Sequence, residues 1–314
     1  MKNLLLAILC LMLFAPFANA DVHKKSVPVT DGANLRILDW NIWGYNKDTI
    51  PDAWKKLGKD PRRDARAPMF AEVINAYHPD IINLQEFNRK MYMSWGAYLR
   101  RANYRLANDE NAQIWCQTPI FYNPETLEVV ERNAVNYVPY KFAVNNSKSY
   151  TVAVFRYKKT GKIFAVLNTH LWWNSEQNMA GSDYARIAQV YTMMAEAETV
   201  KQKYNCPIFV TGDMNSTEHD SSVSKFIEGG YKPCYKIATK VTDNRCGIHH
   251  CGPEGYSLSR NSKTAPTDRE NGAIDHCLLY NAQKDTEIVG FICDHENFIS
   301  YISDHYPNII DIKI

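Results

Sequence analysis

The sequence predicts an α/β fold in which helices cover buried sheets, and three observations support this. Apolar runs with strand character alternate with helical patterns, and a strand, helix, strand order occurs twice. The strand "DIINLQE" is a nearly continuous apolar run, as expected for a strand covered on both faces. No Gly/Ser-rich linker or block of like charge separates the two halves. Residues 21–314 therefore read as one domain built from two similar lobes.

The first twenty residues have the layout of a signal peptide. Lys2 precedes an apolar run that Pro16 interrupts, and the small residues "ANA" come directly before Asp21. The run is too short and too broken for a comfortable membrane span. We expect residues 1–20 to be removed and the remaining chain to be exported, to the periplasm or the cell exterior.

The first half contains a strand, a helix and a second strand. Residues 35–42, "LRILDWNI", alternate as a strand does. Residues 64–79 then place Phe70, Val73, Ile74 and Tyr77 on one helical face, and Pro79 ends that helix. The next strand is "DIINLQE", residues 80–86.

The second half repeats this order after a hairpin. Residues 150–171, "YTVAVFRYKKTGKIFAVLNTHL", predict two strands that turn at Lys159–Gly161. A helix is expected over residues 182–204, with Ser182 or Asp183 as its N-cap. Its buried face is predicted from the spacing of four apolar residues: Ile187, Val190, Tyr191 and Met194. The strand "PIFVTGDMN" follows at residues 207–215.

The last third supplies late strands and a long loop. "AIDHCLLY", "TEIVGFICDHE" and "SDHYPNIIDIKI" have strand character. Residues 229–272 are rich in Gly, Pro, Ser and Asn, which indicates a loop that is functional or pinned by a disulfide. Within it, Cys234, Cys246 and Cys251 lie close together in sequence, and an oxidising compartment favours a disulfide there. A zinc site that also uses His249 and His250 is the alternative.

Global charge does not indicate a nucleic-acid-binding protein. The formal net charge is +2, and loss of Lys2 with the signal peptide leaves +1. Two local segments, residues 55–66 and 99–105, are basic. They could flank a polyanionic substrate, although a solvated helix face is the usual role of such runs.

Eight polar side chains each follow or interrupt one of the predicted apolar strands. They are Asn41, Glu86, His170, Asp213, Asn215, Asp275, Asp304 and His305. In layered α/β folds, catalytic groups gather at strand ends, where rigid sheets hold the loops in place. We therefore expect these eight side chains to form one site.

The chemistry that suits this set is the cleavage of a phosphate ester. Glu86, Asp304 and Asn41 offer the hard oxygen ligands that Mg²⁺ or Ca²⁺ prefers. Two histidines and an Asp-x-Asn add proton transfer and water placement. A phosphodiester needs both functions, because charge builds up in its in-line transition state. The sequence has no P-loop and no Gly-x-Ser-x-Gly elbow, which argues against nucleotide-driven transfer and serine hydrolysis.

Six motifs in order resemble the endonuclease/exonuclease/phosphatase superfamily, of the deoxyribonuclease I and exonuclease III type. They are "DWNIWG", "LQEF", "NTHLWW", "GDMNS", "AIDHCLLY" and "SDHYP", and they extend from about Leu35 to the C-terminus. The resemblance implies a four-layered α/β sandwich with two central mixed β-sheets flanked by helices. It also implies a divalent-metal-dependent phosphoric ester hydrolase.

The resemblance assigns metal binding to Asn41 and Glu86, with Asp304 nearby. The ion would be Mg²⁺ or another divalent cation such as Mn²⁺ or Ca²⁺. Asp213 would position or deprotonate the attacking water, and Asn215 would orient that water or the phosphate.

The remaining catalytic positions belong to the histidines. The resemblance implies that His305 contacts the scissile phosphate or acts as the acid, polarised by Asp275. His170 would bind the phosphate from the opposite side.

Weaker substrate-binding candidates surround this set. Tyr122 matches a position where relatives place a tyrosine near phosphate, but it could equally pack in the core. Arg186 could reach the site or form a surface pair. One of Trp172 and Trp173 could stack on a base or a lipid, with the other in the core.

The substrate is the least determined property. Nucleic acid is favoured, and a phosphoinositide phosphatase or a sphingomyelinase-like lipid phosphodiesterase is the alternative. A non-catalytic binding protein on the same scaffold would predict damaged motifs, and all six are intact. We expect a monomer without an obligate protein partner.

Overall fold

The computed structural model describes residues 26–44, 66–108, 116–137, 148–242, 251–252, 256–257, 272–294, 296, 298–299 and 302–314. The signal-peptide segment, residues 55–65 of the first basic segment, and the Cys246, His249 and His250 cluster lie outside the described residues. None of the helices in the described ranges combines the length and the apolar character needed to cross a bilayer.

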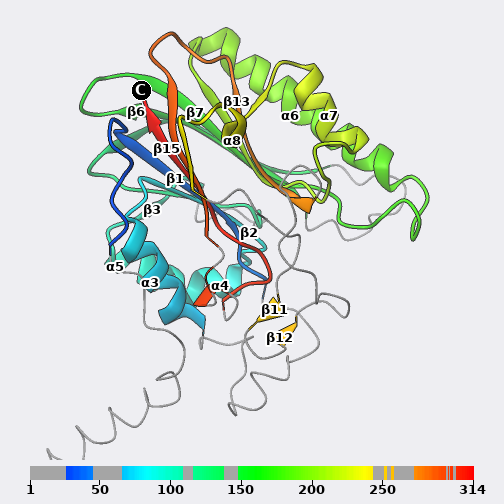
Figure 1. Cartoon of the computed structure of the whole chain (residues 1–314), viewed down its shortest axis with the longest axis horizontal. Coiled ribbons are helices and arrows are strands. Elements are labelled where there is room, and N and C mark those ends of the chain that lie inside the picture. The colour runs from blue at the N-terminus through cyan, green and yellow to red at the C-terminus, as the bar shows by residue number, and fades with distance from the viewer. Residues whose placement is uncertain are drawn as a thin grey trace, which may run out of the picture.

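Two mixed sheets dominate the described part of the chain (Figure 1). The first has seven strands in the order β10 (Lys240–Thr242), β14 (Glu287–Cys293), β15 (Asn308–Lys313), β1 (Leu35–Asn41), β2 (Ile81–Gln85), β4 (Ile120–Tyr122) and β3 (Arg105–Leu106). The second has six strands in the order β5 (Leu127–Asn136), β6 (Ser149–Tyr157), β7 (Ile163–His170), β8 (Ile208–Asp213), β13 (Asp275–Tyr280) and β9 (Lys232–Pro233). A short pair, β11 (Cys251–Gly252) and β12 (Tyr256–Ser257), lies apart from both.

Helices cover the outer face of each sheet (Figure 1). Helices α3 (Ala67–Tyr77), α4 (Arg89–Ser94) and α5 (Gly96–Arg101) pack on the seven-stranded sheet. Helices α6 (Ser182–Tyr204) and α7 (Ser221–Glu228) pack on the six-stranded sheet, and α8 (Cys234–Ile237) lies near β13 and β14. The main core cluster joins side chains of both sheets, such as Ile37, Val166 and Phe209. The result is the four-layered α/β sandwich expected from the motifs.

The core strands and the first helix agree with the sequence-based expectations. Phe70, Val73, Ile74 and Tyr77 are all buried on α3, and His78 ends that helix in a left-handed conformation. The hairpin is also confirmed, because β6 and β7 pair antiparallel across the turn at residues 158–162.

The predicted buried face of α6 is wrong in part. Val190 is buried, but Tyr191 is 53% exposed, and Ile187 and Met194 are only half-buried. The buried stripe instead contains polar residues together with apolar ones: Ser182, Ala185, Arg186, Gln189, Val190, Met193, Ala197 and Val200. Gly181 is the N-cap, and neither Ser182 nor Asp183 takes that role.

The stretch from residue 229 is less loop-like than expected. Residues 232–242 contain β9, α8 and β10, and β9 and β10 are edge strands of the two sheets. Cys234 is a buried thiol in α8, and Cys293, at the end of β14, is disulfide-bonded.

Candidate active site

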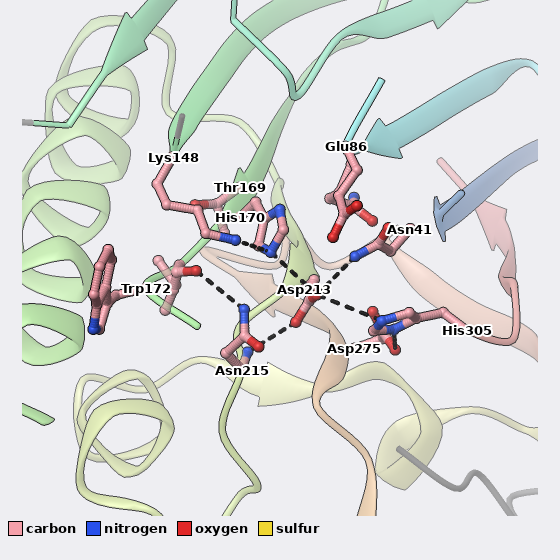
Figure 2. Close-up of polar contacts among 12 residues, drawn as sticks. Asn41, Glu86, Lys148, Thr169, His170, Trp172, Asp213, Asn215, Asp275 and His305 are labelled. Carbon is pink, nitrogen blue, oxygen red and sulfur yellow. Dashed lines mark hydrogen bonds and ion pairs between the residues drawn. The ribbon is translucent and has the colours of Figure 1, made fainter. Parts of the chain in front are cut away.

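Polar side chains from both sheets meet at one end of the sandwich (Figure 2). Asn41 ends β1 and Glu86 follows β2 in one sheet, while His170 and Asp213 end β7 and β8 in the other. Because β7 and β8 are parallel and in register, His170 and Asp213 are direct neighbours across the ladder. The strand ends thus bring together the side chains that the sequence spreads over more than 250 residues.

Asp213 lies at the centre of this group. Its Oδ2 accepts a hydrogen bond from Asn41 Nδ2 at 2.8 Å, which joins the two sheets, and its Oδ1 accepts from the backbone N–H of Asn215 at 2.9 Å. His170 Nε2 and His305 Nε2 lie 3.3 and 3.8 Å from Oδ2. Burial opposes ionisation of Asp213, but the positive charge of His305 and Lys148, together with the hydrogen bond from Asn41, outweighs it and lowers the pKa of this carboxyl. Asp213 is therefore a carboxylate at neutral pH.

His305 and Asp275 form a hydrogen-bonded pair beside Asp213. His305 Nδ1 donates to Asp275 Oδ2 at 2.8 Å, so Nε2 faces the centre of the site. Burial disfavours the imidazolium, but Asp275, Asp304 and Asp213 outweigh it and raise the pKa of His305 to about 10. His305 therefore carries a positive charge at neutral pH.

His170 differs from His305 in charge because Lys148 contacts it. Burial and the Lys148 ammonium lower the pKa of His170 to about 3, so its Nε2 accepts a hydrogen bond from Lys148 Nζ. The charge around Asp213 thus resides on His305 and Lys148.

Lys148 is absent from the candidates identified in the sequence. Lys148 directly precedes β6, and its side chain is buried. The next residue, Ser149, pairs with His170 in the β6–β7 ladder, so Lys148 lies close to His170. The sequence contained the signal, because counting residue pairs outward from the hairpin turn places Lys148 next to the end of "NTH".

Glu86 reaches the site through an unusual backbone conformation. Gln85 faces the space between the sheets, so simple alternation would turn Glu86 away from it. A left-handed φ of 58° re-aims Glu86, and its Oε2 accepts from Gly44 N at 2.8 Å. Trp43 and Asn215 also have positive φ values, 55° and 48°, and such conformations cost energy in non-glycine residues. Strained backbone therefore lies next to the polar centre on both sheets.

Two sets of side chains could hold a metal ion. Asp213, Asp275 and His305 have ligand atoms within 4.8 Å of one another. His305 Nδ1 is hydrogen-bonded to Asp275 there, which leaves only Nε2 of this histidine for a metal ion. Glu86 and Asn41 present carboxylate and amide oxygens above Asp213 in Figure 2, and these oxygens suit a hard divalent cation. The Asp304 carboxylate, whose Oδ1 lies 3.9 Å from His305 Nε2, is the third oxygen ligand predicted for this second set.

Arg66 connects the segment that follows Asn41 with the segment that precedes His305. Its Nη1 donates to Ile42 O at 2.8 Å and to Ile302 O at 2.6 Å, and its Nη2 donates to Trp43 O at 2.7 Å. The guanidinium also lies over the Trp43 and Trp95 rings, 4.8 and 5.1 Å from their centroids. Its segment was expected to flank the substrate or to form a solvated helix face, but Arg66 is fully buried. The basic segment at residues 99–105, in contrast, does expose Arg100, Arg101 and Arg105.

Three weaker substrate-binding candidates have other roles among the described contacts. Tyr122 pairs with Ile81, at the start of β2 and away from the site, and its ring packs 5.6 Å from Phe155. Arg186 is buried and donates to the carbonyls of Trp172 and Asn174, so it supports the loop after β7.

Trp172 also lies away from the polar centre. Its side chain lies beside α6, where Nε1 donates to Ser182 Oγ at 3.1 Å (Figure 2). Its neighbour Trp173 is 61% exposed. Trp173 is thus the tryptophan of this pair that is available for stacking.

Comparisons with known proteins agree with this geometry. The model of the Endonuclease/Exonuclease/phosphatase family matches residues 40–305. The RNA exonuclease NGL1 of Saccharomyces cerevisiae is 36% identical over 83 residues, which are 24% of this chain and 21% of that protein. The chain therefore matches only about a fifth of that relative's length.

Solved structures show the same fold at low sequence identity. A mannosyl-6-phosphatase of Bacteroides thetaiotaomicron matches with a TM-score of 0.67 and 18% identity, over 90% of this chain and 100% of that one. The catalytic domain of human Nocturnin, with a bound sulfate anion, matches with a TM-score of 0.63 and 17% identity, over 89% and 94% of the two chains. From the family match and the fold together, this chain belongs to the endonuclease/exonuclease/phosphatase family.

Proposed function

We propose that this protein is an exported phosphodiesterase that uses a divalent cation and acts on nucleic acid. The observation that carries the proposal is the arrangement around Asp213. A buried carboxylate lies between a neutral His170 and a positively charged His305, and a hydrogen bond joins it to Asn41 on the opposite sheet. This arrangement combines an acceptor for a water proton with cationic groups for the phosphate.

In this proposal Asp213 accepts the proton of the attacking water, or orients that water toward phosphorus. Asn215 bonds Leu171 O through its Nδ2 at 3.1 Å, which holds its amide beside Asp213. A carboxylate of lowered pKa is a weak base, so its main contribution is to place the water.

Positive groups on two sides of Asp213 suit the charge of a phosphodiester. His305, as an imidazolium fixed by Asp275, donates from Nε2 to a phosphate oxygen or to the leaving oxygen. Lys148 supplies a second cation from the β6 side, through or beside His170. A divalent cation, Mg²⁺ in our proposal, would be held by Glu86, Asn41 and Asp304 and would neutralise charge as the P–O bond breaks.

Nucleic acid as the substrate is supported by features outside the catalytic centre. Trp173, three residues after His170, offers an exposed ring on which a base could stack. Arg89 and Lys90 are exposed shortly after Glu86. The relative that matches in sequence is named an RNA exonuclease.

The decisive experiment measures hydrolysis of bis(p-nitrophenyl) phosphate with Mg²⁺ and with excess chelator. We expect turnover that chelation abolishes and that Asp213→Ala or His170→Ala lowers by at least about 10². Turnover that chelator does not affect would remove the metal from the mechanism. Absence of turnover on every phosphate ester tried would favour a binding protein.

A substrate panel then tests the nucleic-acid assignment. DNA, RNA, phosphoinositide and sphingomyelin are compared at equal concentration. A preference for a lipid substrate would replace the nuclease proposal by the lipid alternative. Export is tested separately, by N-terminal sequencing of protein recovered from outside the cytoplasm, which we expect to begin at Asp21.

A further inference from the structure

A layer of polar side chains lies beneath the site, in the space between the two sheets. Residues two positions apart on a strand face the same side, about 6.6 Å apart. Three members of the layer each lie two positions before a site residue: Asp39 before Asn41, Asn168 before His170, and Thr211 before Asp213. A fourth member, Gln85, directly precedes Glu86. Asn83, two positions before Gln85, completes the layer, whose members are all 0% exposed.

Hydrogen bonds in this layer connect the two sheets. Gln85 Nε2 donates to Asp39 Oδ1 at 2.8 Å and across the sandwich to Asn168 Oδ1 at 2.7 Å. Asn168 Nδ2 donates back to the carbonyls of Leu84 and Pro119, at 2.9 and 3.0 Å. Each sheet is thereby tied to the other directly below the strand ends that carry the site.

A second bond completes the connection. Asn83 Nδ2 donates to Thr211 Oγ1 at 2.8 Å, from β2 to β8. In register, Asp39 pairs with Asn83 and Asn41 pairs with Gln85. Asn168 and His170 pair in the same way with Thr211 and Asp213. The polar layer and the site above it are therefore built on the same four strands, with β1 paired to β2 and β7 paired to β8.

This polar layer is unfavourable for the stability of the folded protein. Within the described residues, Asp39 Oδ2, Asn83 Oδ1 and Gln85 Oε1 are buried without a hydrogen-bond partner. Unsatisfied buried polar atoms are unfavourable, and the main core cluster that joins the two sheets is built of apolar side chains. Departures of this kind from the rules of core packing are expected where function requires them.

We propose that the layer sets the position of one sheet relative to the other and thereby aligns the two halves of the site. Gln85 and Asn168 are the central positioning residues, because their bond crosses between the sheets. This inference rests on the proposed function, since it assigns the metal-binding half to Asn41 and Glu86 and the phosphate-binding half to His170 and Asp213. Asn168 contacts none of the proposed metal ligands in the described hydrogen bonds, yet the proposal makes metal binding depend on it.

The test compares the full-length protein with Gln85→Met, Asn168→Leu and the double variant. Val166→Ala is the matched control, because Val166 is fully buried on the same face of β7, two residues farther from the site. Mn²⁺ binding is measured by calorimetry, and kcat is measured on bis(p-nitrophenyl) phosphate. We expect each single variant to weaken Mn²⁺ binding about tenfold and to lower kcat about 10- to 100-fold. The double variant should lose no more than the worse single one, since the two side chains act as a unit.

Several outcomes would overturn the inference. Wild-type Mn²⁺ affinity and kcat in both variants would do so, as would losses no larger than those of Val166→Ala. Absence of Mn²⁺ binding by the unmodified protein would also overturn it. If the larger substitutions prevent folding, Thr211→Val replaces them, because it removes only one hydroxyl from the layer. We expect this variant to bind Mn²⁺ about threefold more weakly. An unchanged Mn²⁺ affinity of Thr211→Val counts against the proposal. If the unmodified protein binds Mn²⁺ but hydrolyses no phosphate ester, the proposed function fails, while calorimetry still decides on the layer.

Discussion

Arg66→Lys tests how strongly one buried guanidinium holds the loops of the site. The substitution keeps the charge but replaces a planar fork by a single ammonium. Arg66 reaches Ile42 O and Ile302 O through Nη1 and reaches Trp43 O through Nη2. A lysine can at best retain the first two bonds, so the Trp43 carbonyl loses its donor.

The magnitude follows from these contacts. An orphaned buried carbonyl costs about 1–3 kcal/mol. Loss of guanidinium stacking on Trp43 and Trp95 adds about 1 kcal/mol. We therefore expect Arg66→Lys to lower the free energy of unfolding by about 2–4 kcal/mol. Activity should also fall, because the affected carbonyls belong to the loop after Asn41 and to the segment before Asp304.

Urea unfolding followed by tryptophan fluorescence measures the stability, and hydrolysis of bis(p-nitrophenyl) phosphate under folded conditions measures the activity. Arg36→Lys is the matched control. Arg36 is also fully buried, but it bonds Asp311 at 2.6 and 2.8 Å at the start of β1, away from the site. The control should lose stability and keep its kcat. A free energy of unfolding within about 0.5 kcal/mol of wild type would refute the reasoning for Arg66→Lys. Equal activity losses in the two variants would refute its link to the site.

Three further predictions concern charge, packing and pH. Lys148→Met should lower kcat on bis(p-nitrophenyl) phosphate by about 10² or more, while Lys148→Arg should retain more activity. Equal rates for wild type and the Met variant would exclude a role for this cation. Gly212→Ala should lower the free energy of unfolding in urea by at least about 3 kcal/mol, because φ is 137° and a Cβ would lie 1.9 Å from Thr169 O. Gly161→Ala, at φ 76° in open space, should lower it by about 1 kcal/mol. Similar losses in both variants would contradict the packing argument. Burial raises the pKa of Asp80 above 3.8, so its stabilising contribution is complete below pH 3.8 and declines as pH rises through the raised value. In urea unfolding across this pH range, the free energy of unfolding should fall less steeply with pH for Asp80→Asn than for wild type. Identical slopes for the two proteins would contradict the assignment.

The strands and the proposed catalytic residues could be predicted because both depend on local patterns. The apolar run in "PIFVTGDMN" ends in its own polar residue, so it indicates both β8 and the end of β8 at Asp213. Once β7 and β8 are assumed to be parallel, His170 and Asp213 meet at one edge. Asp275 instead begins β13, which runs antiparallel to β8, so its position opposite Asp213 depends on tertiary pairing.

The buried face of α6 could not be found from apolar spacing, because its buried side is partly polar. Gln189 Oε1 accepts from Trp172 N at 2.8 Å, and Arg186 donates to carbonyls of the same loop. These two residues are buried to support the loop after β7, which a pattern of apolar positions does not reveal. Arg66 escaped notice for a related reason, because a run of basic residues normally indicates solvent exposure, whereas its partners are backbone carbonyls distant in sequence.

The position of β15 has a consequence for the order of events during protein synthesis. This strand, residues 308–313, lies between β1 and β14 in the interior of its sheet, and His305 comes shortly before it. A nascent chain that has not yet emerged past this strand has a gap beside β1 and lacks the imidazolium that faces Asp213. Truncated translation products should therefore be inert, and hydrolytic capability should appear only after the ribosome has released this segment.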